Sequence, residues 1–191
     1  MTTRQEEITR EAIKLIAEKG IQGVTIKNLA HAINVSEPAL YRHFKNKTSI
    51  LLAILDSFHV LMPQSEIIEI FRTKTPLERI IFLFTEHFKK FAETPSLVSV
   101  VFSDEIFKNE KVLTEKIREL IEENEKLFLN LIAEGQRKGE IRNDLPAEHL
   151  VLLILGAFRL EVKKWEISSY SFDLVEEGKK LLDSIKIILI N

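Results

Sequence analysis

The chain has 191 residues, of which 45% are hydrophobic, and its 27 Lys or Arg against 29 Asp or Glu give a net charge of −2. This composition predicts a globular protein of one or two domains, and the absence of cysteine excludes disulfides, thiolate catalysis and cysteine-ligated zinc. The N-terminus has no apolar secretion signal and the longest apolar run (150–158) is too short to span a bilayer, so we expect a cytoplasmic protein without membrane contact.

The first predicted element is a helix from about Arg4 to Lys19, which Gly20 should end. The segment 26–45 (IKNLAHAINVSEPALYRHFK) then has the pattern of a helix-turn-helix, with a short helix, a tight turn and a second helix that is apolar on one face. The second helix of such a unit lies in the major groove of DNA. The sequence therefore predicts a DNA-reading head at the N-terminus.

Suitable residues stand at each position of this unit. Thr25 and Ser36 are placed as N-caps of the two helices, and Asn34 falls where the chain must reverse through a left-handed conformation. Leu40 and Phe44 are four residues apart and should pack inward. The opposite face of the second helix should carry Pro38, Arg42 and Lys45.

The charge distribution favours DNA binding over an ordinary helical hairpin. Residues 1–50 carry eight Lys or Arg against five Asp or Glu, a balance of +3, so residues 51–191 carry −5. A basic head on an acidic body suits a nucleic-acid reader, because attraction to phosphates supplies most of the non-specific affinity.

Five motifs in this region together resemble a known family. They are Val24-Thr25-Ile26, Leu29-Ala30, Val35-Ser36, Ala39-Leu40-Tyr41-Arg42-His43-Phe44 and Lys47. The series is similar to the N-terminal signature of the TetR/AcrR family of bacterial transcription regulators. The resemblance covers about the first 50 residues, and the remainder matches only in length and helical character. It implies an all-helical homodimer that binds a palindromic operator on double-stranded DNA, usually as a repressor released by a small molecule.

Ten residues are candidate DNA contacts: Thr25, Ser36, Glu37, Pro38, Ala39, Tyr41, Arg42, His43, Lys45 and Lys47. Arg42, which we place in the middle of the second helix, has two open roles, a fork onto guanine O6 and N7 or a phosphate contact. Ala39 is suited to a thymine methyl group. Glu37 is suited to cytosine N4, although favourable charge at a helix N-terminus is the simpler explanation.

The family resemblance adds a more specific expectation about phosphate contacts, which it puts at Thr25, Tyr41, His43 and Lys47. For His43, packing beside Phe44 remains an alternative. We expect Arg42→Ala to reduce sequence preference and Lys47→Ala to weaken binding to all DNA sequences alike.

The apolar period and the Pro or Gly residues between segments predict six further helices: 47–61, 76–92, 95–107, 110–138, 146–167 and 172–190. A shorter helical piece is expected at 64–71. Asn46 should cap the first of the six helices and Pro63 should end or kink it. In the family this helix links the head to the body, so it is the candidate lever. The predicted fold is all-α with about nine helices, a helix-turn-helix domain at 1–46 and a ligand-binding and dimerisation domain at 47–191.

A mainly aromatic set in the predicted body is the candidate effector pocket: Phe84, His87, Phe88, Phe91, Phe102, Phe128, Phe158 and Arg159. Aromatic residues at helical spacing most often form a core, and ligand pockets are also mostly apolar with a few polar groups, so both interpretations stay open. The expected effector is an apolar or aromatic small molecule, whose identity the sequence does not give.

The last two predicted helices carry the candidate dimer interface: Leu150, Leu153, Ile154, Gly156, Ala157, Leu181, Ile185 and Ile188. The segment 150–158 (LVLLILGAF) is apolar on all sides and needs cover on both flanks. A fully buried core helix is one explanation, and a four-helix bundle with a second copy is the other. We favour pairing, because a palindromic operator needs two heads held one turn of DNA apart.

No metal, cofactor or catalytic site is expected. The five histidines are scattered, and the chain has no Gly-rich phosphate loop and no nucleophile elbow. The leading hypothesis is a ligand-gated repressor. The alternative is a DNA-bound protein–protein adaptor of the nucleoid-occlusion type, because SEPALYRHFKNKT is close to the segment that such an adaptor carries. A helical enzyme, the third hypothesis, is disfavoured because no site for it is visible.

Overall fold

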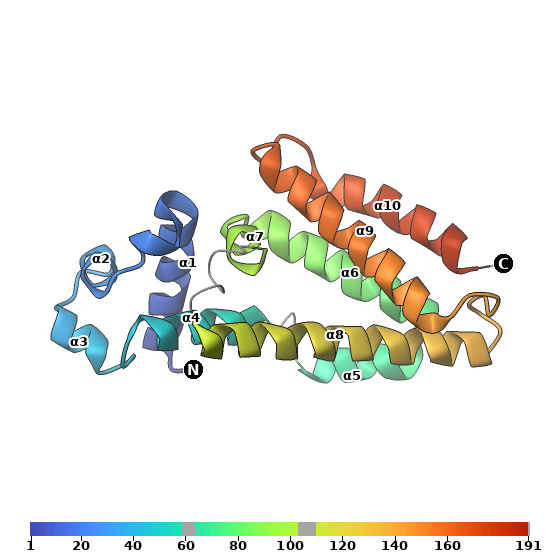
Figure 1. Cartoon of the computed structure of the whole chain (residues 1–191), viewed down its shortest axis with the longest axis horizontal. Helices are drawn as coiled ribbons and strands as arrows, with labels where there is room; N and C mark the ends of the chain where they lie inside the picture. The colour runs from blue at the N-terminus through green and yellow to red at the C-terminus, as the bar shows by residue number, and fades with distance from the viewer. Residues whose placement is uncertain (59–63, 103–109, 191) are drawn as a thin grey trace. The chain divides into compact units, whose positions relative to one another are not determined.

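The computed structural model describes residues 1–58, 64–102 and 110–190, and every regular element within them is a helix (Figure 1). The helices are α1 (Thr3–Gly23), α2 (Ile26–Ala32), α3 (Glu37–Tyr41), α4 (Lys47–Phe58), α5 (Gln64–Thr73), α6 (Pro76–Glu93), α7 (Ser96–Val101), α8 (Lys111–Arg137), α9 (Ala147–Ile167) and α10 (Leu174–Leu189). The predicted all-α fold is therefore confirmed. None of the helices in these ranges has the length and apolarity that a membrane crossing requires.

By their internal contacts the residues form two compact units. The head unit comprises Met1–Val60 and Ser96–Glu119, and the body unit comprises Leu61–Pro95 and Leu120–Asn191. In the head unit α1 packs against α2, α4 and α7, whereas in the body unit α10 packs against α6 and α9 (Figure 1). The domain boundary after residue 46 stays a prediction.

Local sequence signals start and end α1. The Thr2 hydroxyl accepts a hydrogen bond from the Gln5 backbone N–H, and the Gln5 side chain accepts one from the Thr2 N–H, which completes a capping box. At Gly20 the backbone leaves the helical region (φ 68°, ψ 179°), as predicted, and one further turn runs to Gly23. The buried face of the helix consists of Ile8, Thr9, Ala12, Ile13, Leu15 and Ile16.

Two boundaries of the body helices lie at the expected signals. A capping box between Thr75 and Glu78 starts α6, with Pro76 in its first turn. Gly139 follows the end of α8 with a φ of 71°, which supports the prediction that it stops this helix. Three residues that we expected at helix ends lie outside the described residues: Leu61, Pro63 and Phe107.

Candidate nucleic-acid interface

The N-caps and the chain reversal of the helix-turn-helix are as the sequence predicts. The Thr25 hydroxyl accepts from the Asn28 backbone N–H at 3.0 Å and caps α2, and Ser36 accepts from the Ala39 N–H at 3.4 Å and caps α3. Between them Asn34 adopts a φ of 53°, so the chain reverses through the left-handed region. The predicted reversal at Asn34 is confirmed.

The two apolar residues of the second helix point into the head. Leu40 is 0% exposed and Phe44 is 6% exposed, so both pack inward as expected. This burial leaves Glu37, Pro38 and Tyr41 on the accessible side, and all three are exposed. The helix therefore has an apolar face that anchors it and a polar face that is free to meet DNA.

The extent of this helix differs from the prediction. We expected Arg42 in the middle of a helix that reaches Lys45, but α3 ends at Tyr41 and Arg42 is its C-cap residue. The Leu40 carbonyl accepts from both His43 N–H (2.9 Å) and Phe44 N–H (3.1 Å), and beyond this turn the chain leaves the helix. The central placement of Arg42 was therefore wrong, and its side chain extends from the end of the helix.

The ten candidate DNA contacts differ in exposure. Seven are exposed: Thr25, Ser36, Glu37, Pro38, Tyr41, Arg42 and Lys45. Three are half-buried: Ala39, His43 and Lys47. The exposed group surrounds α3, which is the arrangement expected for an element that enters a groove with phosphate contacts on either side.

Lys47 has a structural contact that the sequence did not reveal. Its Nζ donates a hydrogen bond to the Ile21 carbonyl at 2.6 Å, at the end of α1. Burial lowers the pKa of Lys47 from its usual value, and the nearby Glu110 carboxylate opposes that shift. The Thr48 hydroxyl also donates to Glu110 at 2.6 Å. The first turn of α4 is therefore tied to two other segments of the head unit.

Five of the predicted pocket residues form a phenylalanine cluster in the body unit: Phe84, Phe88, Phe91, Phe128 and Phe158. Phe84 stacks on Phe128 with ring centroids 4.7 Å apart, and the Phe158 ring lies 5.0 Å from Phe84 and 4.8 Å from Phe88. Each of the five is 9% exposed or less. Of the other predicted members, Phe102 belongs to the head unit and Arg159 is exposed.

His87 is the polar member of this neighbourhood. Its ring meets Phe158 edge-on at 5.8 Å, and Nδ1 lies 2.6 Å from the Leu83 carbonyl. Because a carbonyl only accepts, Nδ1 carries the proton, and Nε2 of the neutral ring is left as an acceptor. Burial lowers the pKa of His87, with the Leu83 hydrogen bond and the Glu86 carboxylate acting in the opposite direction.

The predicted dimer residues divide into two groups. Leu150, Ile154 and Ile185 are at most 2% exposed within the single protomer, so placing them at an interface was wrong. They face the body core because the helical period puts them on the inner side of α9 and α10. Leu153, Gly156 and Ile188 are exposed, and Ala157 and Leu181 are half-buried.

The outer side of these two helices carries large exposed apolar side chains: Leu152, Leu153, Leu160, Ile187 and Ile188. Each is between 45% and 72% exposed. The apolar character of residues 150–158 on all sides is thus explained only in part by the core, because the outer residues are uncovered in the protomer. Exposed apolar surface of this kind marks an interaction site where it is contiguous.

Among the described residues no three His, Asp or Glu side chains group closely enough to hold a metal ion.

Comparison with known proteins extends over nearly the whole chain. Residues 8–54 match the family described as "Bacterial regulatory proteins, tetR family", and residues 62–189 match "YsiA-like protein, C-terminal region". The chain is 25% identical to the "Probable acrEF/envCD operon repressor" of Escherichia coli (strain K12), over 97% of this chain and 86% of that protein. It is 24% identical to the "Fatty acid metabolism regulator protein" of Bacillus subtilis (strain 168), over 93% and 91% respectively.

A solved structure has a similar fold. The transcriptional regulator FadR from Bacillus subtilis, in complex with stearoyl-CoA, superposes with a TM-score of 0.82. The two sequences are 23% identical, and the match covers 98% of this chain and 100% of that chain.

Proposed function

Because the chain belongs to the tetR family of bacterial regulatory proteins, we propose that it is a transcriptional repressor that binds a palindromic operator as a homodimer and is released by a small molecule. The geometry of the head carries this proposal. The reversal at Asn34 and the burial of Leu40 present α3 with its polar side outward. A short helix held in this way is suited to the major groove.

The direct contacts with bases are assigned to the exposed start of α3. In helix-turn-helix proteins the N-terminal residues of the recognition helix reach the base edges, which here are Ser36, Glu37 and Pro38. Tyr41 is exposed on the same helix and supplies a hydroxyl for a phosphate or a base. Arg42 and Lys45 come after the helix and are better placed for the DNA backbone than for a base.

Pairing is assigned to the outer face of α9 and α10. The exposed residues Leu153 and Leu160 on α9 and Ile188 on α10 supply apolar area that a second copy of the chain would cover. Two helices from each protomer form a four-helix bundle, which is a common isologous interface. Gly156, where an added Cβ would meet nothing within 4 Å, allows close approach of a partner helix.

The effector is assigned to the body unit. We propose a long-chain acyl-CoA as the first compound to test, because a relative is described as a fatty acid metabolism regulator and the similar FadR structure contains stearoyl-CoA. The phenylalanine cluster with His87 at its side is consistent with an acyl chain that separates aromatic rings, and with a polar group that bonds to Nε2. Release requires that the ligand prefer one body conformation, because equal affinity for two states shifts nothing.

The decisive experiment is selection of bound sequences from random DNA by the full-length protein. We expect enrichment of a palindrome whose half-sites lie about one helical turn apart. Fluorescence anisotropy on the selected site, with and without stearoyl-CoA, then tests release, and coenzyme A alone is the control for the acyl chain. Failure to enrich any sequence would overturn the proposed function. Enrichment without release by stearoyl-CoA would overturn only the proposed effector.

The nucleoid-occlusion adaptor remains the alternative. The segment SEPALYRHFKNKT, which suggested this alternative, is part of the shared head motif and does not distinguish the two roles. Binding sites spread over the chromosome, together with co-purification of a cell-division protein, would favour it.

A further inference from the structure

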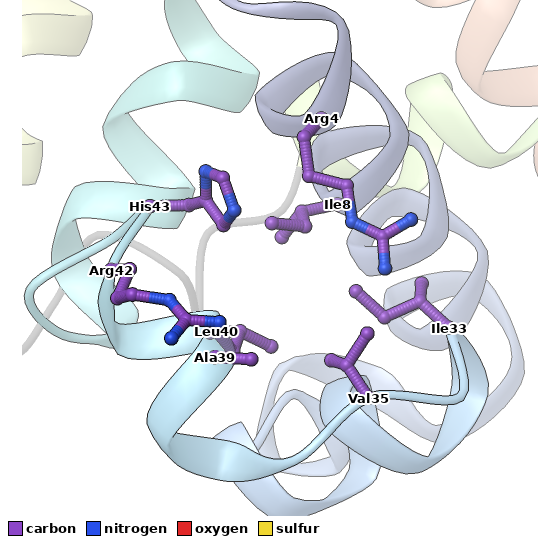
Figure 2. Close-up of a pocket in the computed structure, with 8 residues that line it drawn as sticks. All are labelled: Arg4, Ile8, Ile33, Val35, Ala39, Leu40, Arg42 and His43. Atoms are coloured by element: carbon purple, nitrogen blue, oxygen red, sulfur yellow. The ribbon is translucent and has the colours of Figure 1, made fainter.

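A small cleft lies between the beginning of α1 and the end of α3 (Figure 2). Its volume is about 140 Å³, and its floor is apolar, with Ile8 and Leu40 at the bottom. Three nitrogen-bearing side chains stand around it: Arg4, Arg42 and His43. Figure 2 shows the two guanidinium groups and the imidazole ring directed toward the same space from different sides. By this measure a cavity needs only about 10–15 Å³ to hold one water molecule, so the space is sufficient for a phosphate group.

The chain holds the two sides of the cleft together. The Gln5 side-chain amide donates to the His43 carbonyl at 3.1 Å, which fixes the beginning of α1 against the end of α3. Ile8 and Leu40, both 0% exposed, pack beneath this contact. Arg4 is therefore carried to a position beside the recognition helix, although it is far from that helix in the sequence.

The charges around the cleft suit an anion. Both guanidinium groups carry a positive charge and present planar sets of N–H donors that match phosphate oxygens. Arg42 forms no ion pair with any residue that the structure describes. Arg4 pairs with Glu7 on the same helix, so the Glu7 carboxylate occupies the position beside Arg4 that an incoming anion would take.

We propose that this cleft binds one phosphate of the operator backbone, with Arg4 and Arg42 on either side of it, and that Arg4 is a DNA-contacting residue. This inference rests on the proposed function. It adds α1 to the DNA-binding surface, and it assigns Arg42 to the backbone instead of a base. Glu7 competes with DNA for Arg4 and is exchanged for the phosphate on binding.

The test compares two arginines of the same helix. Arg4→Gln and Arg10→Gln each remove one positive charge from α1, but Arg10 is exposed and does not line the cleft. Operator affinity is measured over a range of salt concentrations. For Arg4→Gln we expect the slope of log K against log salt to decrease in magnitude by about 1.8, the value of two phosphate contacts, one in each half-site, and the affinity to fall about a hundredfold. Arg10→Gln should keep the wild-type slope.

Glu7→Gln supplies the opposite change. Removing the Glu7 carboxylate should tighten operator binding when Arg4 is retained. This gain in affinity should disappear when Arg4→Gln is combined with Glu7→Gln. A gain of the same size in both backgrounds would mean that Glu7 acts only through general charge, and would overturn the exchange.

A methylphosphonate scan of the operator identifies the phosphate concerned. Neutralising one phosphate in each half-site should weaken the wild type and leave Arg4→Gln unaffected at that position. Equal salt slopes for Arg4→Gln and Arg10→Gln, or no position at which the two proteins differ, would overturn the cleft proposal while sequence-specific binding still stood. If the wild type selects no sequence, it is the proposed function that fails.

Discussion

At the scale of single residues, Asn34 has the largest conformational role in the head. Its φ of 53° is costly for most residues with a side chain, and it is tolerated by Asn and by Gly. The sequence indicated this position because Asn stands between two helices that must cross. The conformation follows from a local rule, and for that reason it could be predicted without a structure.

Two substitutions at Asn34 should separate conformation from chemistry. We expect Asn34→Ala to lower the free energy of unfolding by about 1 kcal/mol, because Cβ strains the left-handed conformation and Ala lacks the local hydrogen-bonding group of Asn. Asn34→Gly should cost much less, since glycine adopts positive φ without strain. Urea denaturation of both variants measures the difference, and equal losses would contradict a conformational role.

His87 should make stability depend on pH. Its folded-state pKa is lowered by burial, whereas in the unfolded chain it returns to about 6.5. Below pH 6.5 the unfolded chain therefore binds a proton that the folded chain does not, and stability is lost as the pH falls. The full contribution is present above pH 6.5.

The variant His87→Gln lacks the imidazole that binds this proton. We expect the wild type to lose more stability than His87→Gln between pH 7.5 and about pH 5.5, as measured by the urea midpoints at each pH. Lowered carboxylate pKa values, such as that of Glu134, act below this window and are shared by both proteins. Parallel pH profiles for the two proteins would show that His87 does not titrate differently on folding.

At the scale of helices, α10 and α6 depend on one glycine. A Cβ added at Gly178 would lie 2.6 Å from Cδ2 of Phe88, a ring that is itself only 1% exposed. We expect Gly178→Ala to destabilise the body unit by about 1–3 kcal/mol, because the ring has no free space to move into. Adding Phe88→Leu should recover part of this loss. A double-mutant cycle with purely additive effects would exclude the contact as the cause.

Helix boundaries show where local sequence rules suffice and where they fail. Capping residues fixed the starts of α2, α3 and α6, since each cap bonds backbone groups within its own first turn. The end of α3 was missed, because Phe44 is required by the core and the Leu40 carbonyl is shared between two N–H groups. Neither fact is visible in an apolar pattern that could continue as a helix through Lys45.

At the scale of the whole molecule, the proposed dimer rests on side chains that the protomer leaves uncovered. Sequence pattern placed the proposed interface on α9 and α10, but it did not separate the inner Leu150 and Ile154 from the outer Leu152 and Leu153. When a helix is apolar on all sides, its sequence does not show which side faces the core. That orientation is set only when the helix packs against the core. The grouping of residues 96–119 with the head was missed for a similar reason, since it depends on packing between α1 and α7.

Introducing charge on this surface should separate the protomers. Leu153→Glu buries a carboxylate in the proposed bundle, so we expect sedimentation to show a monomer and operator affinity to fall by at least tenfold. Asn130→Glu on α8 adds the same charge at an exposed polar position and should remain dimeric. If Leu153→Glu sediments like the wild type, the interface lies elsewhere.

The bond from Lys47 to the Ile21 carbonyl has a mechanical consequence. This bond from the start of α4 to the far end of α1 should make the two helices move as one rigid unit. A force that rotates α4 would then rotate α1 with it, without bending between the two helices. When Lys47 is replaced by a residue with a shorter side chain, amide deuterium uptake should therefore rise both in the last turn of α1 and in the first turn of α4. An increase in only one of these two turns is not expected.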